Sequence, residues 1–234
     1  MTVRLVDCRP HDAYVEGHLP GAVHLDREHA LTGEIGDATR GRHPLPETGD
    51  LTAAFARAGV GPGTFALCHD DGDGWAQRLW WLLRHVGHDS AGTFDLRSYE
   101  GPFTTDEPVV DAVEVAPRVR EDDTITAEEI RERLDDPRLV LVDARSPERW
   151  RGEVEPLDPV AGRIPGARNA FFEQPLPDGL LDAPELAVYC GSGVTACVVL
   201  QRLALAGRPD ARLYAGSFSE WCRRSGYPIE KGTP

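Results

Sequence analysis

The chain has 234 residues, 41% of them hydrophobic and 27% charged, so it has enough apolar material for buried cores and enough length for two domains. Its formal net charge of −14 argues against nucleic acid as a partner, because binding to phosphates relies on a basic surface. Its five cysteines form no CxxC pair, and no signal-peptide pattern or long apolar stretch is visible, so we expect a cytoplasmic protein with no metal and no membrane partner.

The first half of the chain has the pattern of an α/β unit. An apolar run that ends at Asp7 predicts a strand, and a glycine-proline turn follows at residues 17–22. A second apolar run at residues 64–68 predicts another strand, and a helical pattern over residues 75–85 comes after a polar turn. Short apolar strands that alternate with longer helices indicate a mainly parallel sheet flanked by helices.

Residues 106–122 separate this half from the next. The stretch is rich in proline, acidic residues and valine, and it shows no helical period. It therefore predicts a linker between one domain over residues 1–105 and a second over residues 123–234. Thr126, followed three residues later by Glu129, predicts a capping box at the start of the first helix of the second domain.

The second half repeats the order of the first. An apolar run ends at Asp143, as the earlier run ends at Asp7, and a glycine-proline turn at residues 162–167 corresponds to the earlier turn. A strand expected at residues 186–189 then leads into a glycine-rich loop and a helical pattern over residues 194–206. Such self-similarity indicates a duplication. We expect an α/β fold of two tandem domains, each with a mainly parallel central sheet flanked by helices.

The loop after the last of these strands carries the strongest chemical signal. Two glycines let its backbone curl tightly, and at a helix N-terminus several N–H groups then point at the cysteine sulfur. Hydrogen bonds to a charged group are worth roughly 1.5–3 kcal/mol each, so this loop favours a reactive thiolate. The alternative is a cysteine that merely ends a buried strand. In order, the loop residues are Cys190, Gly191, Ser192, Gly193, Val194 and Thr195.

These features resemble the two-domain rhodanese family, which comprises thiosulfate and 3-mercaptopyruvate sulfurtransferases. The resemblance rests on the tandem markers, the cysteine loop and a closing stretch at residues 214–221, and it covers nearly the whole chain. It implies two tandem rhodanese-like domains and a sulfurtransferase that uses no cofactor. Cys190 would take sulfur from a small anionic donor as a persulfide and pass it to an acceptor. The acceptor would be cyanide or a thiol, thioredoxin or another thiol protein included.

The arginines divide into two groups. Arg9 and Arg145 occur in both copies, so we expect them to brace the aspartates two residues before them. Arg149 occurs only in the second copy, and the resemblance implies that it binds the carboxylate or sulfonate of the donor through bidentate hydrogen bonds. The substrate would also contact the loop at Gly191, Gly193, Val194 and Thr195.

Two features depart from the family pattern. Mercaptopyruvate enzymes carry a second substrate arginine shortly after the first, but residues 155–159 contain none. The thiosulfate enzymes often have a basic residue inside the cysteine loop, and this loop has none either. Arg151 and Arg163 are the alternatives that could compensate.

The resemblance also assigns roles to the first copy. Asp26 and His43 match residues that face a serine two positions after the nucleophile, here Ser192, and the three would form a proton relay at the leaving group. Asp70 falls opposite Cys190 when the copies are compared. A carboxylate cannot become a persulfide, so we expect the first domain to be inactive.

Two other functions remain to be weighed. A phosphatase of the Cys-x5-Arg type needs an arginine six residues after the cysteine, where this chain has Ala196. A non-catalytic rhodanese-like binding or regulatory module, with both copies degenerate, is the alternative to a sulfurtransferase. Cys190 and its two glycines favour the enzyme.

Overall fold

Two four-stranded parallel sheets form the framework of the structure, a computed structural model that describes residues 1–36 and 38–233. The strand orders are β2-β1-β3-β4 and β6-β5-β7-β8, so the second sheet repeats the order of the first. The predicted tandem α/β fold is therefore confirmed. The chain divides into two compact units, the first formed by Met1–Glu34 with Leu45–Arg120 and the second by Ile35–Pro44 with Glu121–Pro234.

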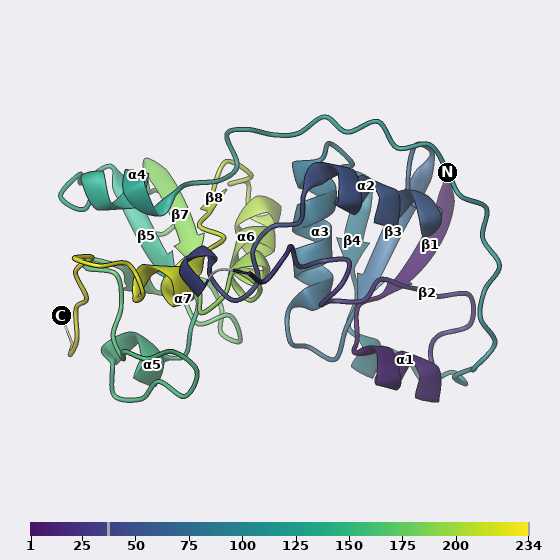
Figure 1. Ribbon diagram of the computed structural model, residues 1–234, viewed down its shortest axis with the longest axis horizontal. Coiled ribbons are helices and arrows are strands. Elements are labelled where there is room, and N and C mark those ends of the chain that lie inside the picture. The colour runs from purple at the N-terminus through teal and green to yellow at the C-terminus, as the bar shows by residue number, and fades with distance from the viewer. Residues whose placement is uncertain (37, 234) are drawn as a thin grey trace. The chain divides into compact units, whose positions relative to one another are not determined.

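The first unit forms from the segments whose patterns predicted strands and helices. The helix α3 packs against β3 and β4 (Figure 1). Its apolar side chains are buried. The strands are β1 (Thr2–Asp7), β2 (Val23–His24), β3 (Thr64–His69) and β4 (Ala91–Thr93). The helices are α1 (His11–Glu16), α2 (Thr48–Arg57) and α3 (Trp75–His85), with a 3-10 turn η2 (Leu96–Ser98).

The second unit has the corresponding elements. The helix α6 packs against β7 and β8, as α3 does against β3 and β4 (Figure 1). The predicted cap of α4 is present, since Thr126 Oγ1 accepts a hydrogen bond from Glu129 N at 3.1 Å. The strands are β5 (Leu139–Asp143), β6 (Arg168–Asn169), β7 (Glu185–Tyr189) and β8 (Arg212–Leu213). The helical segments are η1 (Ala38–Arg40), α4 (Ala127–Glu132), α5 (Pro147–Arg151), α6 (Ala196–Leu205) and α7 (Ser217–Trp221).

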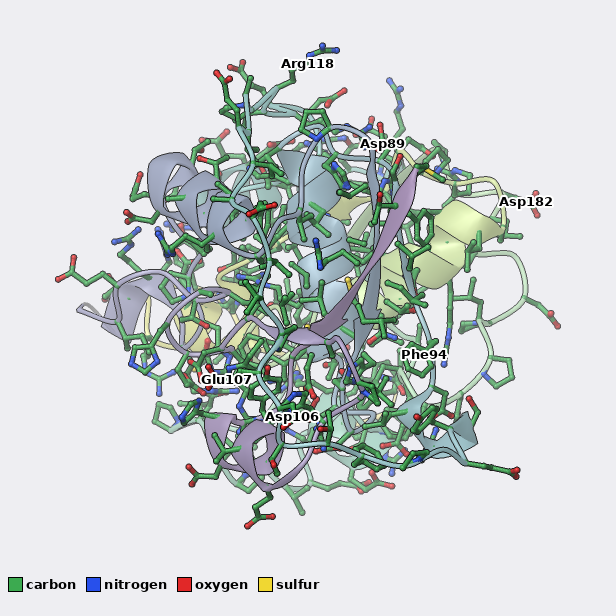
Figure 2. All side chains as sticks on the ribbon, turned by 90° about the vertical axis from the view of Figure 1, so that its right-hand side faces the viewer. Asp89, Phe94, Asp106, Glu107, Arg118 and Asp182 are labelled. Carbon is green, nitrogen blue, oxygen red and sulfur yellow. The ribbon has the colours of Figure 1, made fainter. Side chains whose placement is uncertain are left out.

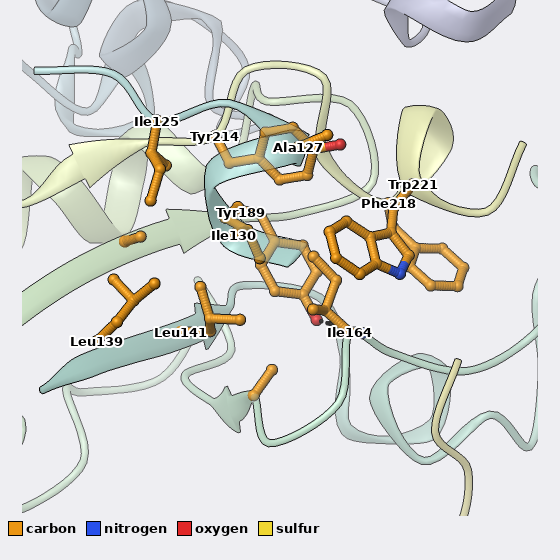
Figure 3. Close-up of a cluster of buried hydrophobic side chains, with 12 residues drawn as sticks. Ile125, Ala127, Ile130, Leu139, Leu141, Ile164, Tyr189, Tyr214, Phe218 and Trp221 are labelled. Carbon is orange, nitrogen blue, oxygen red and sulfur yellow. Dashed lines mark hydrogen bonds between the residues drawn. The ribbon is translucent and has the colours of Figure 1, made fainter. Parts of the chain in front are cut away.

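Aromatic side chains hold the end of β7 in the core of the second unit. Tyr189, Phe218 and Trp221 are fully buried and pack with Ile130 (Figure 3). The hydroxyl of Tyr189 accepts a hydrogen bond from the backbone N–H of Ile164 at 3.1 Å, so this buried polar atom has a partner. The last residue of β7 is thereby fixed, and the loop that follows it starts from a rigid position.

The stretch predicted as a linker, residues 106–122, runs along the first unit (Figure 1). The backbone N–H groups of Val113, Arg118 and Arg120 donate to carbonyls in α2 and at the end of α3. The guanidinium of Arg120 also pairs with Asp89 at 2.8 Å. Figure 2 labels Asp89 and, from the linker stretch, Arg118. Most of this stretch therefore packs as part of the first unit, and the division of the chain proposed from sequence stays a prediction. No helix in the described part of the chain has the length and apolar character needed to cross a membrane.

An ion pair of the same geometry follows β1 and β5. Arg9 Nη2 lies 2.7 Å from Asp7 Oδ2, and Arg145 Nη2 lies 2.6 Å from Asp143 Oδ2. Each arginine also donates, at 2.7 Å, to a glycine carbonyl in the turn that follows. The predicted bracing role of both arginines is confirmed. All four side chains are buried, so the pairs satisfy charges that would otherwise be costly to desolvate.

His69 occupies in the first unit the position that Tyr189 has in the second. Its ring is fully buried and lies edge-on to Phe94, and within the described residues neither ring nitrogen has a hydrogen-bond partner. Burial lowers the pKa of His69 below its usual range, although the carboxylate of Asp7, 3.8 Å from Nε2, favours the charged form. The guanidinium of Arg9 adds to the lowering.

This histidine should make the first unit sensitive to acid. The unfolded chain binds a proton at His69 with a pKa of about 6.5, whereas the folded unit binds it only at lower pH. The free energy of unfolding should therefore decrease as the pH falls below ~6.5, until the folded pKa is passed. Urea unfolding at several pH values measures the free energy of unfolding. In His69→Gln, the part of its decrease at acid pH that is due to His69 should disappear. An unchanged pH dependence in the variant would contradict the prediction.

Candidate active site

Cys190 directly follows β7, and the start of α7 holds its backbone. The N–H of Cys190 donates to Ser217 Oγ at 3.1 Å, and the N–H of Phe218 donates to the Cys190 carbonyl at 3.0 Å. The hydroxyl of Ser217 donates in turn to the carbonyl of Tyr214 at 2.9 Å. Ser217 has a φ of 54°, a strained conformation for a residue other than glycine. The position of Cys190 is thus fixed from both sides.

The thiol of Cys190 accepts a hydrogen bond from the backbone. The N–H of Gly193 donates to Cys190 Sγ at 3.1 Å, which is one of the several contacts of this kind expected from the sequence. Gly193 has a φ of +82°, and a Cβ at this position would lie 2.5 Å from the carbonyl oxygen of Ala215. Only glycine fits this turn without strain. The hydrogen bond from the N–H of residue 193 to sulfur therefore depends on glycine at this position.

The remaining loop residues lead into α6. Val194 and Ser192 are buried, and Thr195 precedes the first residue of the helix, which begins at Ala196. The helical pattern had predicted a start two residues earlier, but Gly193 is in the left-handed region and the turn delays the helix. The N-terminal end of α6 therefore follows the cysteine loop directly, and its dipole favours negative charge there.

Three of the other cysteines lie in surroundings that disfavour the thiolate. Burial raises the pKa of Cys8, Cys68 and Cys222, and nearby carboxylates raise each of them further. A thiol with a raised pKa is protonated at neutral pH and reacts slowly. Cys190 is itself only 2% exposed, and its sulfur accepts the N–H of Gly193 in the loop that leads into α6.

A segment from the first half of the chain, Ile35–Pro44, belongs to the second unit. It contacts α7 through the 3-10 turn η1. The N–H of Arg42 donates to Ser219 Oγ at 3.1 Å. Gly41 has a φ of +85°, and a Cβ there would lie 2.6 Å from the carbonyl oxygen of Gly216. The close approach of the two backbones depends on this glycine.

This segment brings His43 to the cysteine loop. His43 Nδ1 lies 2.9 Å from Ser192 Oγ, at hydrogen-bond distance, so two of the three residues expected to form a relay are in contact. Asp26 belongs to the first unit, where its carboxylate lies 2.8 Å from the ring of His29 and accepts the N–H groups of Glu28 and His29. Burial opposes its ionisation, but the hydrogen bonds from His29 prevail and lower the pKa of Asp26. Its part in a relay stays a prediction.

Arg149, expected to bind the donor, is held by a buried carboxylate. Its Nη2 and Nε lie 2.7 Å and 3.1 Å from the oxygens of Glu155, whose side chain is only 2% exposed. A Cβ on Gly191 would lie 3.2 Å from Arg149 Nη2. The guanidinium thus lies against the residue that follows Cys190, and its role in binding the donor stays a prediction.

The two arginines considered as substitutes for a second substrate arginine have other partners. Arg151 pairs with Glu153 at 2.7 Å on the surface. Arg163 is 1% exposed, donates to two backbone carbonyls and pairs with Glu230. Its guanidinium also lies over the ring of Trp150 at 4.2 Å. Both arginines support the fold. Their contacts do not place either of them where a second substrate arginine would be needed.

Arg42 does reach the cysteine loop, although no sequence motif pointed to it. Its Nη2 lies 2.7 Å from the position that a Cβ of Gly191 would take. The sequence could have indicated that Arg42 lies near the loop, because it directly precedes His43, which was expected there. The resemblance connected only the histidine with the site.

In the first copy, Asp70 fills the corresponding loop with its own carboxylate. Its Oδ1 accepts the N–H of Gly72, and its Oδ2 accepts those of Gly74 and Ala76, all at 2.9 Å. Asp70 is buried, with 6% exposure. The backbone donors of this loop therefore bind a side chain of the chain itself, whereas the second copy directs a donor at the sulfur of Cys190.

Comparison with known proteins matches residues 1–104 and 126–224 to the family described as the rhodanese-like domain. The chain is 38% identical to a probable 3-mercaptopyruvate sulfurtransferase of Pseudomonas aeruginosa, over 94% of this chain and 86% of that protein. It is 36% identical to the putative thiosulfate sulfurtransferase SseB of Mycobacterium tuberculosis, over 98% of this chain and 89% of that protein.

Solved structures give the same result. The crystal structure of a probable thiosulfate sulfurtransferase aligns with a TM-score of 0.66 at 33% identity and covers 97% of both chains. That of SseA from Escherichia coli, described among 3-mercaptopyruvate sulfotransferases, aligns with a TM-score of 0.76 at 25% identity and covers 92% of both. Relatives named for either sulfur donor are thus similar to this chain.

Proposed function

The chain belongs to the rhodanese-like family and is a sulfurtransferase, and from that premise we propose that Cys190 carries the transferred sulfur as a persulfide. The observation that carries the proposal is the hydrogen bond of 3.1 Å from the N–H of Gly193 to Cys190 Sγ, ahead of α6. A backbone donor and a helix N-terminus both stabilise negative charge on sulfur. They would also stabilise the negative charge of a terminal persulfide.

In the first half-reaction, the thiolate of Cys190 attacks the outer sulfur of the donor. With thiosulfate, the S–S bond breaks and its electron pair leaves on sulfite, so no proton is needed. With 3-mercaptopyruvate, the C–S bond breaks and the electron pair leaves on the carbon of the pyruvate enolate, which must take up a proton. The contact between His43 and Ser192 supports a route for that proton. Asp26 is proposed to assist this pair.

The donor is proposed to bind through its oxyanion. Arg149 offers a guanidinium beside Gly191, and its pairing with the buried Glu155 holds it in place. The backbone of the loop at Gly193, Val194 and Thr195 would surround the sulfur.

In the second half-reaction, an acceptor removes the outer sulfur. Cyanide or a thiolate attacks that sulfur, the S–S bond of the persulfide breaks, and its electron pair returns to Cys190 as thiolate. A thiol protein such as thioredoxin is a suitable acceptor. We also propose a reducing, cytoplasmic setting, which the five free cysteines favour.

Mass measurement of the intact protein tests the persulfide. After incubation with thiosulfate or 3-mercaptopyruvate, the protein should gain about 32 Da, the mass of one sulfur atom, and cyanide should remove the gain. Peptide mapping should place the gain on Cys190. No adduct with either donor would favour the alternative, a non-catalytic rhodanese-like binding module.

Replacing His43 should separate the two donors. His43→Ala removes the ring that contacts Ser192, so kcat with 3-mercaptopyruvate should decrease at least about a hundred-fold, the lower end of what a proton-transferring group contributes. Turnover of thiosulfate should change much less, because sulfite leaves without a proton. Steady-state kinetics with both donors measure the difference. Equal losses for both would count against a proton-transfer role.

A further inference from the structure

We propose that Arg163 is a positioning residue that holds α5, the helix carrying Arg149, in place throughout the physiological pH range. The proposal rests on the proposed function, since it takes Arg149 as a residue that binds the donor. The corresponding residue of the first copy is His18, and each of the two lies two residues before the proline of its glycine-proline turn. The exchange of histidine for arginine makes the contact independent of pH in the copy that carries the nucleophile.

The helix α5 depends on contacts from outside itself. It has five residues, and none of them is buried. An isolated helix of this length is not stable in water, and its last carbonyl groups have no partner within the helix. The N–H of Gly152 donates to the carbonyl of Arg149 at 3.1 Å. The carbonyls of Trp150 and Arg151 bond to other segments of the second unit.

Arg163 and a segment that it binds supply both of these partners. Arg163 Nη1 donates to the carbonyl of Trp150 at 3.2 Å and to that of Gly232 at 2.6 Å. The N–H of Gly232 donates in turn to the carbonyl of Arg151 at 2.8 Å. The backbone of Arg163 also forms an antiparallel bridge with Glu230, whose carboxylate pairs with the guanidinium. One side chain thus fastens the end of α5 and the segment that caps it.

The first copy has the same arrangement around His18. Its Nδ1 lies 2.9 Å from the carbonyl oxygen of Tyr14, the tyrosine of α1, and its ring stacks on that side chain. Its backbone forms an antiparallel bridge with Thr104, and its Nε2 lies 3.2 Å from the carbonyl oxygen of Asp106, two residues further on. Arg163 repeats these contacts, including the spacing of two residues between the bridge and the second carbonyl.

The two side chains differ in how they can serve two carbonyl groups. A neutral imidazole has one N–H and donates to only one of them, so only a protonated His18 ring can donate to both. A guanidinium has five N–H donors and stays charged throughout the physiological range. Both residues are 1% exposed, so water does not readily replace a donor that is lost. Arg163 therefore removes a dependence on pH that a histidine would bring.

The charge in direct contact with the guanidinium of Arg163 is that of Glu230. A carboxylate in this place would also favour the charged form of a histidine at position 163. The arginines of the surrounding segments are paired with carboxylates of their own. The other charged residues on these segments are Arg145, Glu148, Arg151, Glu153 and Lys231.

Exchanging the two residue types tests the proposal. In Arg163→His, the new ring should be largely charged at pH 6 and neutral at pH 8, on either side of the ordinary histidine pKa of about 6.5. Thiosulfate has no proton to lose in this range. Its KM relative to the wild type should stay within about threefold at pH 6 and rise about tenfold at pH 8, with a smaller change in kcat. The matched control His18→Arg, in the first unit, should keep KM within about threefold at both pH values.

Hydrogen exchange gives a readout that does not depend on activity. In Arg163→His, the amides at the end of α5 and in residues 229–232 should be less protected at pH 8 than at pH 6, after correction for intrinsic exchange rates. The wild type should show no such difference there. In the first unit, the wild type should show it at residues 104–106, and His18→Arg should remove it.

The outcomes are distinct. A KM ratio for Arg163→His that is the same at pH 6 and pH 8 would overturn the positioning role, even if exchange became dependent on pH. If Arg163→His fails to fold by circular dichroism, Glu230→Ala removes the paired carboxylate instead. That variant should exchange faster at residues 229–232 and raise KM about threefold, and no change in either would overturn the proposal. A wild-type protein that forms no persulfide would instead contradict the proposed function.

Discussion

Cys190→Ser should lower turnover with thiosulfate and with 3-mercaptopyruvate by at least about a thousand-fold. A serine hydroxyl is nearly the same size as a thiol, but it is not ionised at neutral pH and it forms no stable bond to sulfane sulfur. The N–H of Gly193 would still find an oxygen acceptor, so the loop should keep its conformation. Steady-state kinetics and the absence of a mass gain of about 32 Da measure the loss.

Cys222→Ser is the matched control. Cys222 lies in the same unit and is half-buried, and burial raises the pKa of its thiol. This variant should retain turnover within about threefold, as expected for a substitution away from the site. If Cys190→Ser kept its activity while Cys222→Ser lost it, the assignment of Cys190 as the nucleophile would be wrong.

Gly193→Ala should have the second largest effect. Its φ of +82° costs an alanine about 1–2 kcal/mol, and the new Cβ would lie 2.5 Å from the carbonyl oxygen of Ala215. The loop must move to relieve that contact, and the N–H that donates to Cys190 Sγ moves with it. We expect kcat/KM to decrease about a thousand-fold, the upper range for the loss of one preorganised backbone donor.

Gly207→Ala separates strain from function. Gly207 lies in the same unit with a φ of +92°, but a Cβ there meets no atom within 4 Å. This variant should lose about 1–2 kcal/mol of unfolding free energy and keep its activity. Urea unfolding and kinetics on both variants make the comparison. Similar activity losses in the two would show that a general loss of stability, and not the N–H of Gly193, explains the effect.

The sequence predicted the fold because each copy carries its own local signals. Alternating apolar runs and helices, with an aspartate at the end of the first strand of each copy, were enough to indicate two related parallel sheets, and the structure has them in the same strand order. The start of α6 was placed too early, at Val194 instead of Ala196, because helical periodicity does not register the left-handed turn at Gly193.

The composition of the site could be predicted only in part. Cys190 and its loop are contiguous in sequence, so their pattern is readable. The sequence pattern does not show that Ile35–Pro44 belongs to the second unit, because this depends on tertiary contacts such as that of Arg42 N with Ser219 Oγ. No periodicity marks such contacts, and a charged residue in a short loop is usually a solvated one. Arg42 was missed for this reason.

The route of Ile35–Pro44 has a consequence for biosynthesis. The ribosome makes this segment well before the residues that it contacts, which lie between Ser192 and α7. The first domain can acquire its sheet while translation continues, since domains fold as units from the N-terminus. The candidate site can be completed only after α7 has been made. A nascent chain that stops before α7 therefore lacks Ser219, whose hydroxyl accepts the backbone N–H of Arg42.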